Sequence, residues 1–249
     1  MGSRVSEALV VCYHSVSDDW DHALAVTTRS FERQLSSLLR RGFRPVPAAE
    51  VLDGRRRSLH VTFDDAFKAV LHAIPVLERL GLHATVFAVT SLADEGHPLA
   101  VPELAREAVS HREHLVTMDW SQLRELAGRG FEIGSHTVSH PHLRELSDTE
   151  LERELVDSRA RIEDELGRPC RLLAYPYGEH DTRVHAAARR SGYAAAFGLA
   201  AGTERTNPYA LPRTDLYRRD SLVRATMKTS FLKPGASAFL ARTRFRPAS

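Results

Sequence analysis

The sequence predicts an α/β protein in which parallel strands form a closed or nearly closed barrel. Short apolar runs alternate with segments of helical periodicity, glycines end several of the helical segments, and about seven strand–helix units fit the chain length. This alternation favours a parallel sheet with right-handed crossovers. A doubly wound open sheet is the alternative, because the pattern does not fix the number of units.

The strands are predicted from short apolar runs bounded by polar or turn residues. The expected strands are Ala8–Tyr13, Phe43–Val46, Leu59–Phe63, Ala84–Val89, Phe131–Ser135, Arg171–Tyr175, Ala194–Phe197 and Ala210–Thr214.

The helices are predicted from apolar residues three or four positions apart. Phe31, Leu35 and Leu38 mark the first helix, which Gly42 stops. The other expected helices run from Val70 to near Gly81, from Trp120 to before Gly130, from Leu151 to before Gly167, and over Asp181–Ser191. The stretch from Leu92 to Val116 is less regular and is interpreted as a partly helical insertion.

Length and composition indicate a single domain over residues 1–249, with a core of about 8–215 and a C-terminal helix and tail at 216–249. The net charge of +2 gives no reason to expect a nucleic-acid partner. No apolar run approaches the ~20 residues that span a bilayer. We therefore expect a soluble, cytoplasmic protein, with Cys12 and Cys170 as buried thiols. The oligomeric state is left open.

Polar residues follow four of the predicted strands. They are His14, the pair Asp64 and Asp65, His136 with His140 shortly after, and the turn Pro176–Gly178. In a parallel barrel, side chains from the C-terminal ends of the strands meet on one rim. These groups are therefore expected to converge.

Asp65, His136 and His140 are the predicted ligands of one divalent metal. If the segment is helical, histidines four positions apart lie on one face and can share a metal ion. Two imidazoles and one carboxylate leave a coordination position open, as in catalytic zinc sites. His142 is expected to face solvent, because Pro141 precedes it and it lies beyond the pair.

The remaining rim residues suggest roles in hydrolysis. Asp64 is the predicted general base for a water activated by the metal. A backbone N–H in the turn around Tyr177 is the predicted donor to a developing oxyanion. His14 is the predicted general acid, with a purely structural strand-end histidine as the alternative.

Three segments resemble the first three motifs of the polysaccharide deacetylase family of carbohydrate esterases. They are Thr62–Asp65, Ser135–Pro141 and Ala174–Gly178, and the opening Val11–Val16 with the helix from Phe31 to Gly42 resembles the branch of biofilm poly-N-acetylglucosamine deacetylases. The resemblance implies a distorted (β/α)7-type barrel and one divalent metal, usually zinc, for which cobalt or nickel can substitute. It also implies that Asp64 is the base and that Asp65 is a ligand.

The chain departs from the family pattern at two places. Many members have an arginine where this chain has Ala174, and that arginine orients the base. Arg213, at the end of the last predicted strand, is expected to supply the charge instead. Many members also carry a general-acid histidine in a C-terminal Leu-x-His motif, whereas no histidine follows His185 here. This again points to His14.

The expected function is the metal-dependent removal of an N-acetyl group from an acetamido sugar, free, lipid-linked or oligomeric, with release of acetate. Peripheral membrane contact is expected only for a lipid-linked substrate. The alternatives are hydrolysis of a non-sugar amide such as a cyclic imide or ureide, and a sugar-binding pseudoenzyme. A non-haem iron oxygenase also uses two histidines and a carboxylate, but the paired aspartates far upstream disfavour it.

Overall fold

The computed structural model describes residues 8–51, 57–199 and 203–230. The strands are β1 (Leu9–Tyr13), β2 (Ser15–Val16), β3 (Ala25–Val26), β4 (Arg44–Pro45), β5 (Ser58–Phe63), β6 (Ala84–Ala88), β7 (Glu132–Ser135), β8 (Leu172–Ala174), β9 (Ala195–Leu199) and β10 (Leu211–Asp215). The α-helices are α1 (Thr28–Arg40), α2 (Ala48–Val51), α3 (Ile74–Leu80), α4 (Ala105–Ser110), α5 (Trp120–Gly128), α6 (Asp148–Leu166), α7 (Thr182–Arg190) and α8 (Leu222–Lys228). Short 3₁₀ helices are η1 (Lys68–His72), η2 (Thr90–Leu92), η3 (Pro102–Leu104), η4 (Arg112–Leu115) and η5 (Pro176–Gly178).

Within these described ranges, seven parallel strands close into a barrel. The strand order is β1-β10-β9-β8-β7-β6-β5, and β5 pairs with β1 to close the ring. The short strand β4 pairs with β5 outside the ring, and β2 pairs with β3 separately. The predicted parallel α/β barrel is therefore confirmed, and the doubly wound sheet is excluded.

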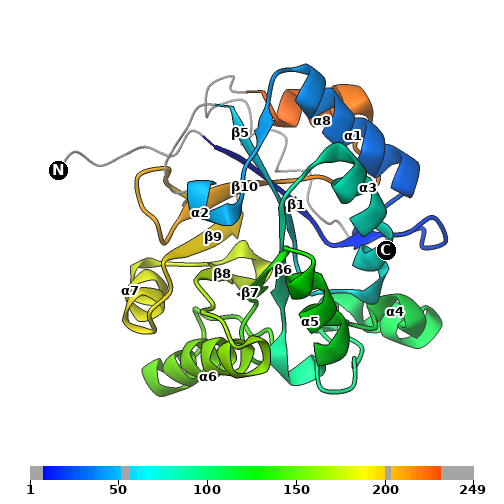
Figure 1. Ribbon diagram of the computed structural model, residues 1–249. Coiled ribbons are helices and arrows are strands. Elements are labelled where there is room, and N and C mark those ends of the chain that lie inside the picture. The colour runs from blue at the N-terminus through cyan, green and yellow to red at the C-terminus, as the bar shows by residue number, and fades with distance from the viewer. Residues whose placement is uncertain (1–7, 52–56, 200–202, 231–249) are drawn as a thin grey trace, which may run out of the picture.

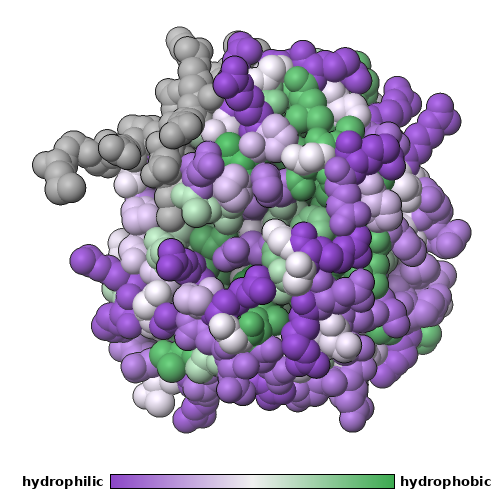
Figure 2. Space-filling view, viewed as in Figure 1, coloured by the Kyte–Doolittle hydropathy of each residue, from purple (hydrophilic) through white to green (hydrophobic). Residues whose placement is uncertain are grey.

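The helices surround the barrel, as Figure 1 shows. Helix α1 buries the side chains of Phe31, Leu35 and Leu38. Helix α6 buries those of Leu155 and Ile162. The large core cluster joins these side chains to outward-facing residues of the strands. Burying such side chains supplies the main stabilisation of the fold. Polar residues dominate the surface seen in Figure 2, with smaller apolar areas between them.

A second cluster of buried residues lies on the other face of the strands, inside the barrel. It includes Val10, Phe87, Ala174, Phe197 and Leu211. Because side chains alternate between the two faces of a strand, the residues two places further along point into the barrel as well. On β1 and β10 these residues are Cys12 and Arg213, which are buried. The strand register thus directs polar groups to one end of the barrel interior.

Helix boundaries follow the expected signals. Gly167 ends α6 in the left-handed conformation, with φ 62°. Ser147 and Glu150 form a capping box at the start of α6. The helix predicted from Val70 to Gly81 is instead divided into η1 and α3.

The irregular stretch 92–116 is partly helical, as predicted: it contains η3, α4 and η4. It packs over the barrel through a satellite cluster that includes Trp20, Phe67, Leu104 and Leu115. None of the helices in the described part of the chain has the length and apolar character needed to cross a bilayer. Helix α8 lies in the expected C-terminal segment 216–249, and residues 231–249 of that segment lie outside the described residues.

Candidate metal centre and active site

The two loops that carry the predicted metal ligands have an unusual backbone. Asp65 has φ 66° and His140 has φ 61°, values that residues other than glycine seldom adopt. The segment after β7 is not a helix, so the helical spacing invoked for His136 and His140 was wrong. A tight loop brings the two rings together instead, because Thr137 at φ 70° reverses the chain between them.

Helix α6 holds this loop through one side chain. The carboxylate of Glu154 accepts hydrogen bonds from the backbone N–H of Val138 and of Ser139, at 2.8 and 3.0 Å, and from the Ser139 hydroxyl at 2.6 Å. The backbone N–H of His140 also donates to the Thr137 hydroxyl at 3.1 Å. Hydrogen bonds from outside the metal centre therefore stabilise the left-handed backbone of this loop.

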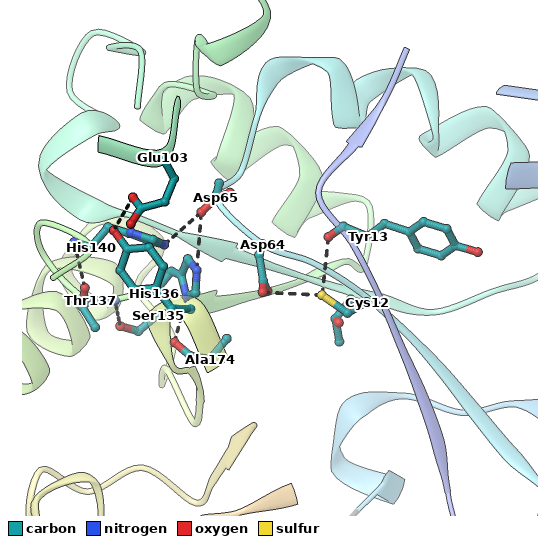
Figure 3. A network of polar contacts seen from close by, with 12 residues as sticks. Cys12, Tyr13, Asp64, Asp65, Glu103, Ser135, His136, Thr137, His140 and Ala174 are labelled. Carbon is teal, nitrogen blue, oxygen red and sulfur yellow. Dashed lines mark hydrogen bonds and ion pairs between the residues drawn. The ribbon is translucent and has the colours of Figure 1, made fainter. Parts of the chain in front are cut away.

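Asp65, His136 and His140 converge at the rim of the barrel (Figure 3). Nε2 of each histidine lies 3.4 Å from Oδ1 of Asp65, and the three ligand atoms lie within 4.8 Å of one another. All three residues are buried. Ligands about 2.0–2.1 Å from a tetrahedral zinc ion are about 3.4 Å apart, so the spacing fits a metal.

The hydrogen bonds around these side chains leave the right atoms free for a metal. Nδ1–H of His136 donates to the Ala174 carbonyl at 2.8 Å, which leaves the Nε2 lone pair facing Asp65. Oδ1 of Asp65 is buried without a hydrogen-bond partner among the described residues. A buried carboxylate oxygen without a partner is costly unless a cation binds it. The donor set therefore fits a divalent metal ion.

Burial and charge act in opposite directions on these groups. Burial disfavours the charged form of His136, but the carboxylates of Asp64 and Asp65 outweigh burial and raise the pKa of its imidazolium. Burial dominates at His140 and lowers its pKa to about 4. Burial also opposes ionisation of Asp65, but both histidines hold the pKa of that carboxyl below its usual value.

Asp64, the predicted base, is held by Arg213. Nη1 of the guanidinium lies 2.6 Å from Oδ1 and Nη2 lies 2.8 Å from Oδ2, a bidentate arrangement inside the barrel. Burial opposes ionisation of Asp64, but the charge of Arg213 outweighs it and keeps the pKa of this carboxyl well below its usual range. The expected contact is present; that Arg213 serves a reaction stays a prediction.

The barrel geometry explains how Arg213 can stand in for an arginine at position 174. Ala174 ends β8, and Arg213 lies on β10, with β9 between them. Both side chains lie on the interior face. The Arg213 guanidinium lies 5.5 Å from the centre of the Phe87 ring and also donates to the Thr62 hydroxyl at 3.3 Å. The small side chain of Ala174 leaves interior space into which a residue from β10 can extend.

His14 lies close to Asp64. A ring nitrogen of His14, the sulfur of Cys12 and a carboxylate oxygen of Asp64 all lie within 4.8 Å of one another. His14 is half-buried, and its ring runs nearly parallel to that of Tyr217 with centres 6.4 Å apart. The structure thus places His14 beside Asp64 at the barrel rim, and its role as the acid stays a prediction.

Cys12 is a buried thiol, which confirms the sequence-based expectation. The structure adds a contact: its Sγ lies 3.5 Å from Oδ2 of Asp64 and donates to it (Figure 3). Burial raises the pKa of the thiol well above its usual value, so the proton stays on sulfur. The alternation along β1 could have shown this, since Cys12 and His14 share a face with Val10.

The turn around Tyr177 lies beside His140. The rings of Tyr177 and His140 meet edge to face at 4.7 Å. The N–H groups of Gly178 and Glu179 donate to the carbonyls of Tyr175 and Pro176. Pro176 has no N–H, so among the described residues of this turn the amide of Tyr177 is the candidate donor. Its role toward an oxyanion stays a prediction.

His142 is partly exposed, with 35% of its side chain accessible, but one face of its ring is covered. Its ring stacks on Tyr177 with centres 3.9 Å apart and planes at 8°. Its Nδ1 lies 3.2 Å from Oε2 of Glu179, and its Nε2 lies 3.9 Å from Oε1 of Glu103. The His142 ring stacks on Tyr177 because the loop that follows His140 passes next to the turn Pro176–Gly178. Sequence reasoning did not identify Glu103 or Glu179.

The structure is thus a closed parallel barrel with an Asp-His-His set of candidate metal ligands at its rim and a second aspartate beside them. The model of the polysaccharide deacetylase family matches residues 52–196, more than half of the chain. The protein belongs to this family. Among curated proteins, the chain is 26% identical over 192 residues to YxkH of Bacillus subtilis (strain 168), which bears the provisional name polysaccharide deacetylase. The match covers 74% of this chain but spans only 61% of that protein.

Solved structures show the same fold. The deacetylase PplD of Streptococcus pyogenes, in complex with acetate, superposes with a TM-score of 0.74 at 20% identity, over 91% of this chain and 99% of that chain. IcaB of Ammonifex degensii gives 0.72 at 22% identity, over 91% and 99%. The polysaccharide deacetylase BC0361 of Bacillus cereus gives 0.73 at 20% identity, over 91% and 70%.

Proposed function

We propose that the protein is a metal-dependent hydrolase that removes an N-acetyl group from an acetamido sugar and releases acetate. The observation that carries the proposal is that a set of metal ligands lies directly beside an ionised aspartate. Asp65, His136 and His140 form a set of metal ligands, and Asp64 beside them is kept ionised by Arg213. A carboxylate next to a Lewis acid can activate water for attack on an amide carbonyl.

Each residue has a defined task in this mechanism. When bound, a divalent metal would polarise the amide carbonyl and acidify the attacking water. The ionised carboxylate of Asp64 takes a proton from that water as its oxygen attacks the carbonyl carbon. The amide N–H of Tyr177 donates to the oxygen that becomes negative. His14 gives a proton to the sugar nitrogen as the C–N bond breaks, so the products are acetate and a free amine.

Family membership and the complex of PplD with acetate support this reaction type. Zinc is the proposed metal, with cobalt or nickel as substitutes, because the ligand set is two imidazoles and one carboxylate. The sugar can be free, lipid-linked or oligomeric; a lipid-linked substrate would bring the protein to a membrane surface. Cytoplasmic localisation stays a prediction, which cell fractionation would test.

Acetate release tests the proposal. The purified protein, loaded with zinc or cobalt, is incubated with N-acetylglucosamine, its β-1,4 and β-1,6 oligomers, and a cyclic imide and a ureide. We expect acetate from at least one acetamido sugar and none after treatment with a chelator. Turnover of the imide or ureide alone would replace the proposed substrate class. Sugar binding without any turnover would identify a pseudoenzyme instead.

A further inference from the structure

The backbone of Tyr177 requires external support. Its φ of 59° and ψ of 2° place it in the left-handed region, which an aromatic residue adopts only where its surroundings fix it. The neighbouring Gly178 also has a positive φ, and a Cβ there would lie 2.4 Å from Leu199. The orientation of the Tyr177 amide therefore depends on what holds this turn.

Three contacts hold the ring of Tyr177. His142 stacks on it with ring centres 3.9 Å apart and planes at 8°, and the ring of His140 meets it edge to face. The hydroxyl donates to Oε2 of Glu103 at 3.5 Å.

His142 is in turn fixed from both sides. Its Nδ1 lies 3.2 Å from Glu179 and its Nε2 lies 3.9 Å from Glu103. Pro141 restricts the backbone before it. Glu103 belongs to η3 in the 92–116 segment, whereas Glu179 directly follows η5. Two glutamates from distant parts of the sequence therefore hold one imidazole against the turn.

We propose that His142, clamped by Glu103 and Glu179, is a positioning residue that fixes Tyr177 so that its amide N–H can stabilise the oxyanion. This inference rests on the proposed function. It gives the 92–116 segment a task, because Glu103 supports both the imidazole and the tyrosine hydroxyl. None of the three residues contacts the reacting atoms in this scheme. Each acts through the Tyr177 backbone.

The test compares His142→Ala, which removes the stack, with His142→Phe, which keeps an aromatic ring of similar extent. Removing an oxyanion donor outright costs about 100–1,000-fold in kcat, so loosening one should lower kcat about 10-fold or more in His142→Ala. KM should change less than about 2-fold, because the donor acts mainly in the transition state. His142→Phe should recover part of the lost kcat, because it restores the stacked ring but not the contacts with Glu103 and Glu179.

Two further measurements separate positioning from folding or metal loss. Metal content of His142→Ala should stay stoichiometric, and deuterium exchange of the peptide spanning 175–179 should become faster. Glu103→Gln should lower kcat in the same direction but by less. The exposed His97→Ala, in the same 92–116 segment, is the matched control and should behave as wild type.

The outcomes distinguish the inference from the proposed function. If wild type releases no acetate from any amide, the proposed function fails. If wild type is active but His142→Ala keeps its kcat, the positioning role is wrong. An equal loss in His142→Ala and His142→Phe, or a loss that follows metal content, would also overturn it.

Discussion

Arg213 holds Asp64 by two parallel hydrogen bonds inside the barrel, from a strand that lies two places away from Ala174. The positive charge therefore reaches the aspartate from a different strand than the family pattern places it. The pair is fully desolvated, with side-chain exposures of 0% for Arg213 and 3% for Asp64. A buried ion pair tolerates the loss of neither partner, which makes both residues informative to mutate.

Replacing Arg213 should affect both stability and pH dependence. Arg213→Met leaves a buried carboxylate unpaired, so the free energy of unfolding at pH 7 should fall by about 3–5 kcal/mol. In wild type the pKa of Asp64 is depressed, so its stabilisation is present above the unfolded-state pKa of about 3.9 and is lost as pH falls further. In Arg213→Met the strongest opposition to burial is removed and only the weaker influence of His136 and His14 remains, so the pKa of Asp64 should rise and move the acid limb of the pH–rate profile to higher pH.

The control for this variant is Arg124→Met, which removes a half-exposed arginine paired with Glu165 on the surface. It should change the unfolding free energy by less than about 1 kcal/mol. Adding Asp64→Asn to Arg213→Met should restore part of the lost stability, because the unpaired charge is gone. An acid limb that stays in place in Arg213→Met would show that Asp64 does not set it.

Asp64→Asn should keep the metal and lose catalysis. The change is nearly isosteric and leaves Asp65, His136 and His140 in place. It also removes the counter-charge of Arg213, so the free energy of unfolding should fall, and activity is compared at a temperature at which the variant is folded. Loss of a positioned base typically costs about 100-fold or more in kcat. The measurement is acetate release together with metal content. Asp157→Asn, an exposed position on α6, should leave both unchanged. Near wild-type kcat in Asp64→Asn would remove Asp64 from the role of base.

Metal binding should depend on pH with a defined sign. The pKa of His136 is raised, so this ring is protonated over more of the acid range than a free histidine, and the proton must leave before a metal binds. The affinity for zinc should therefore fall as pH decreases.

His136→Ala should abolish stoichiometric binding in a chelator-competition titration. The exposed His83→Ala should retain it, and metal retained by His136→Ala would remove that ligand from the site.

Much of this architecture could be predicted because two features of a parallel barrel are visible in the sequence. Strand–helix alternation predicts the closed sheet, and the rule that functional groups follow the strands is enough to place Asp65, His136 and His140 on one rim. The local backbone was less predictable. Helical spacing of the histidines suggested a helix, whereas Thr137 and His140 adopt left-handed conformations in a tight loop.

Contacts between distant segments were the least predictable. The clamp around His142 joins Glu103 and Glu179, which are unremarkable acidic residues in the sequence. Nothing in a single sequence indicates that the 92–116 segment packs back over the rim. The contact of Cys12 with Asp64 was accessible in principle, because alternation along β1 puts that thiol on the face that carries His14.

The last prediction concerns His14. Hydrolysis of an amide needs a proton for the departing nitrogen, and His136 and His140 face Asp65. His14 is half-buried on the same rim, with a ring nitrogen within 4.8 Å of the Asp64 carboxylate, close enough for the two to serve one bound substrate. His14→Ala should retain stoichiometric metal, lower kcat by about 100-fold, the scale of general acid catalysis, and remove the loss of activity at high pH. His83→Ala is the control for a histidine on the surface. If the alkaline limb persists in His14→Ala, another group protonates the amine, and the mechanism proposed for this site needs a different acid.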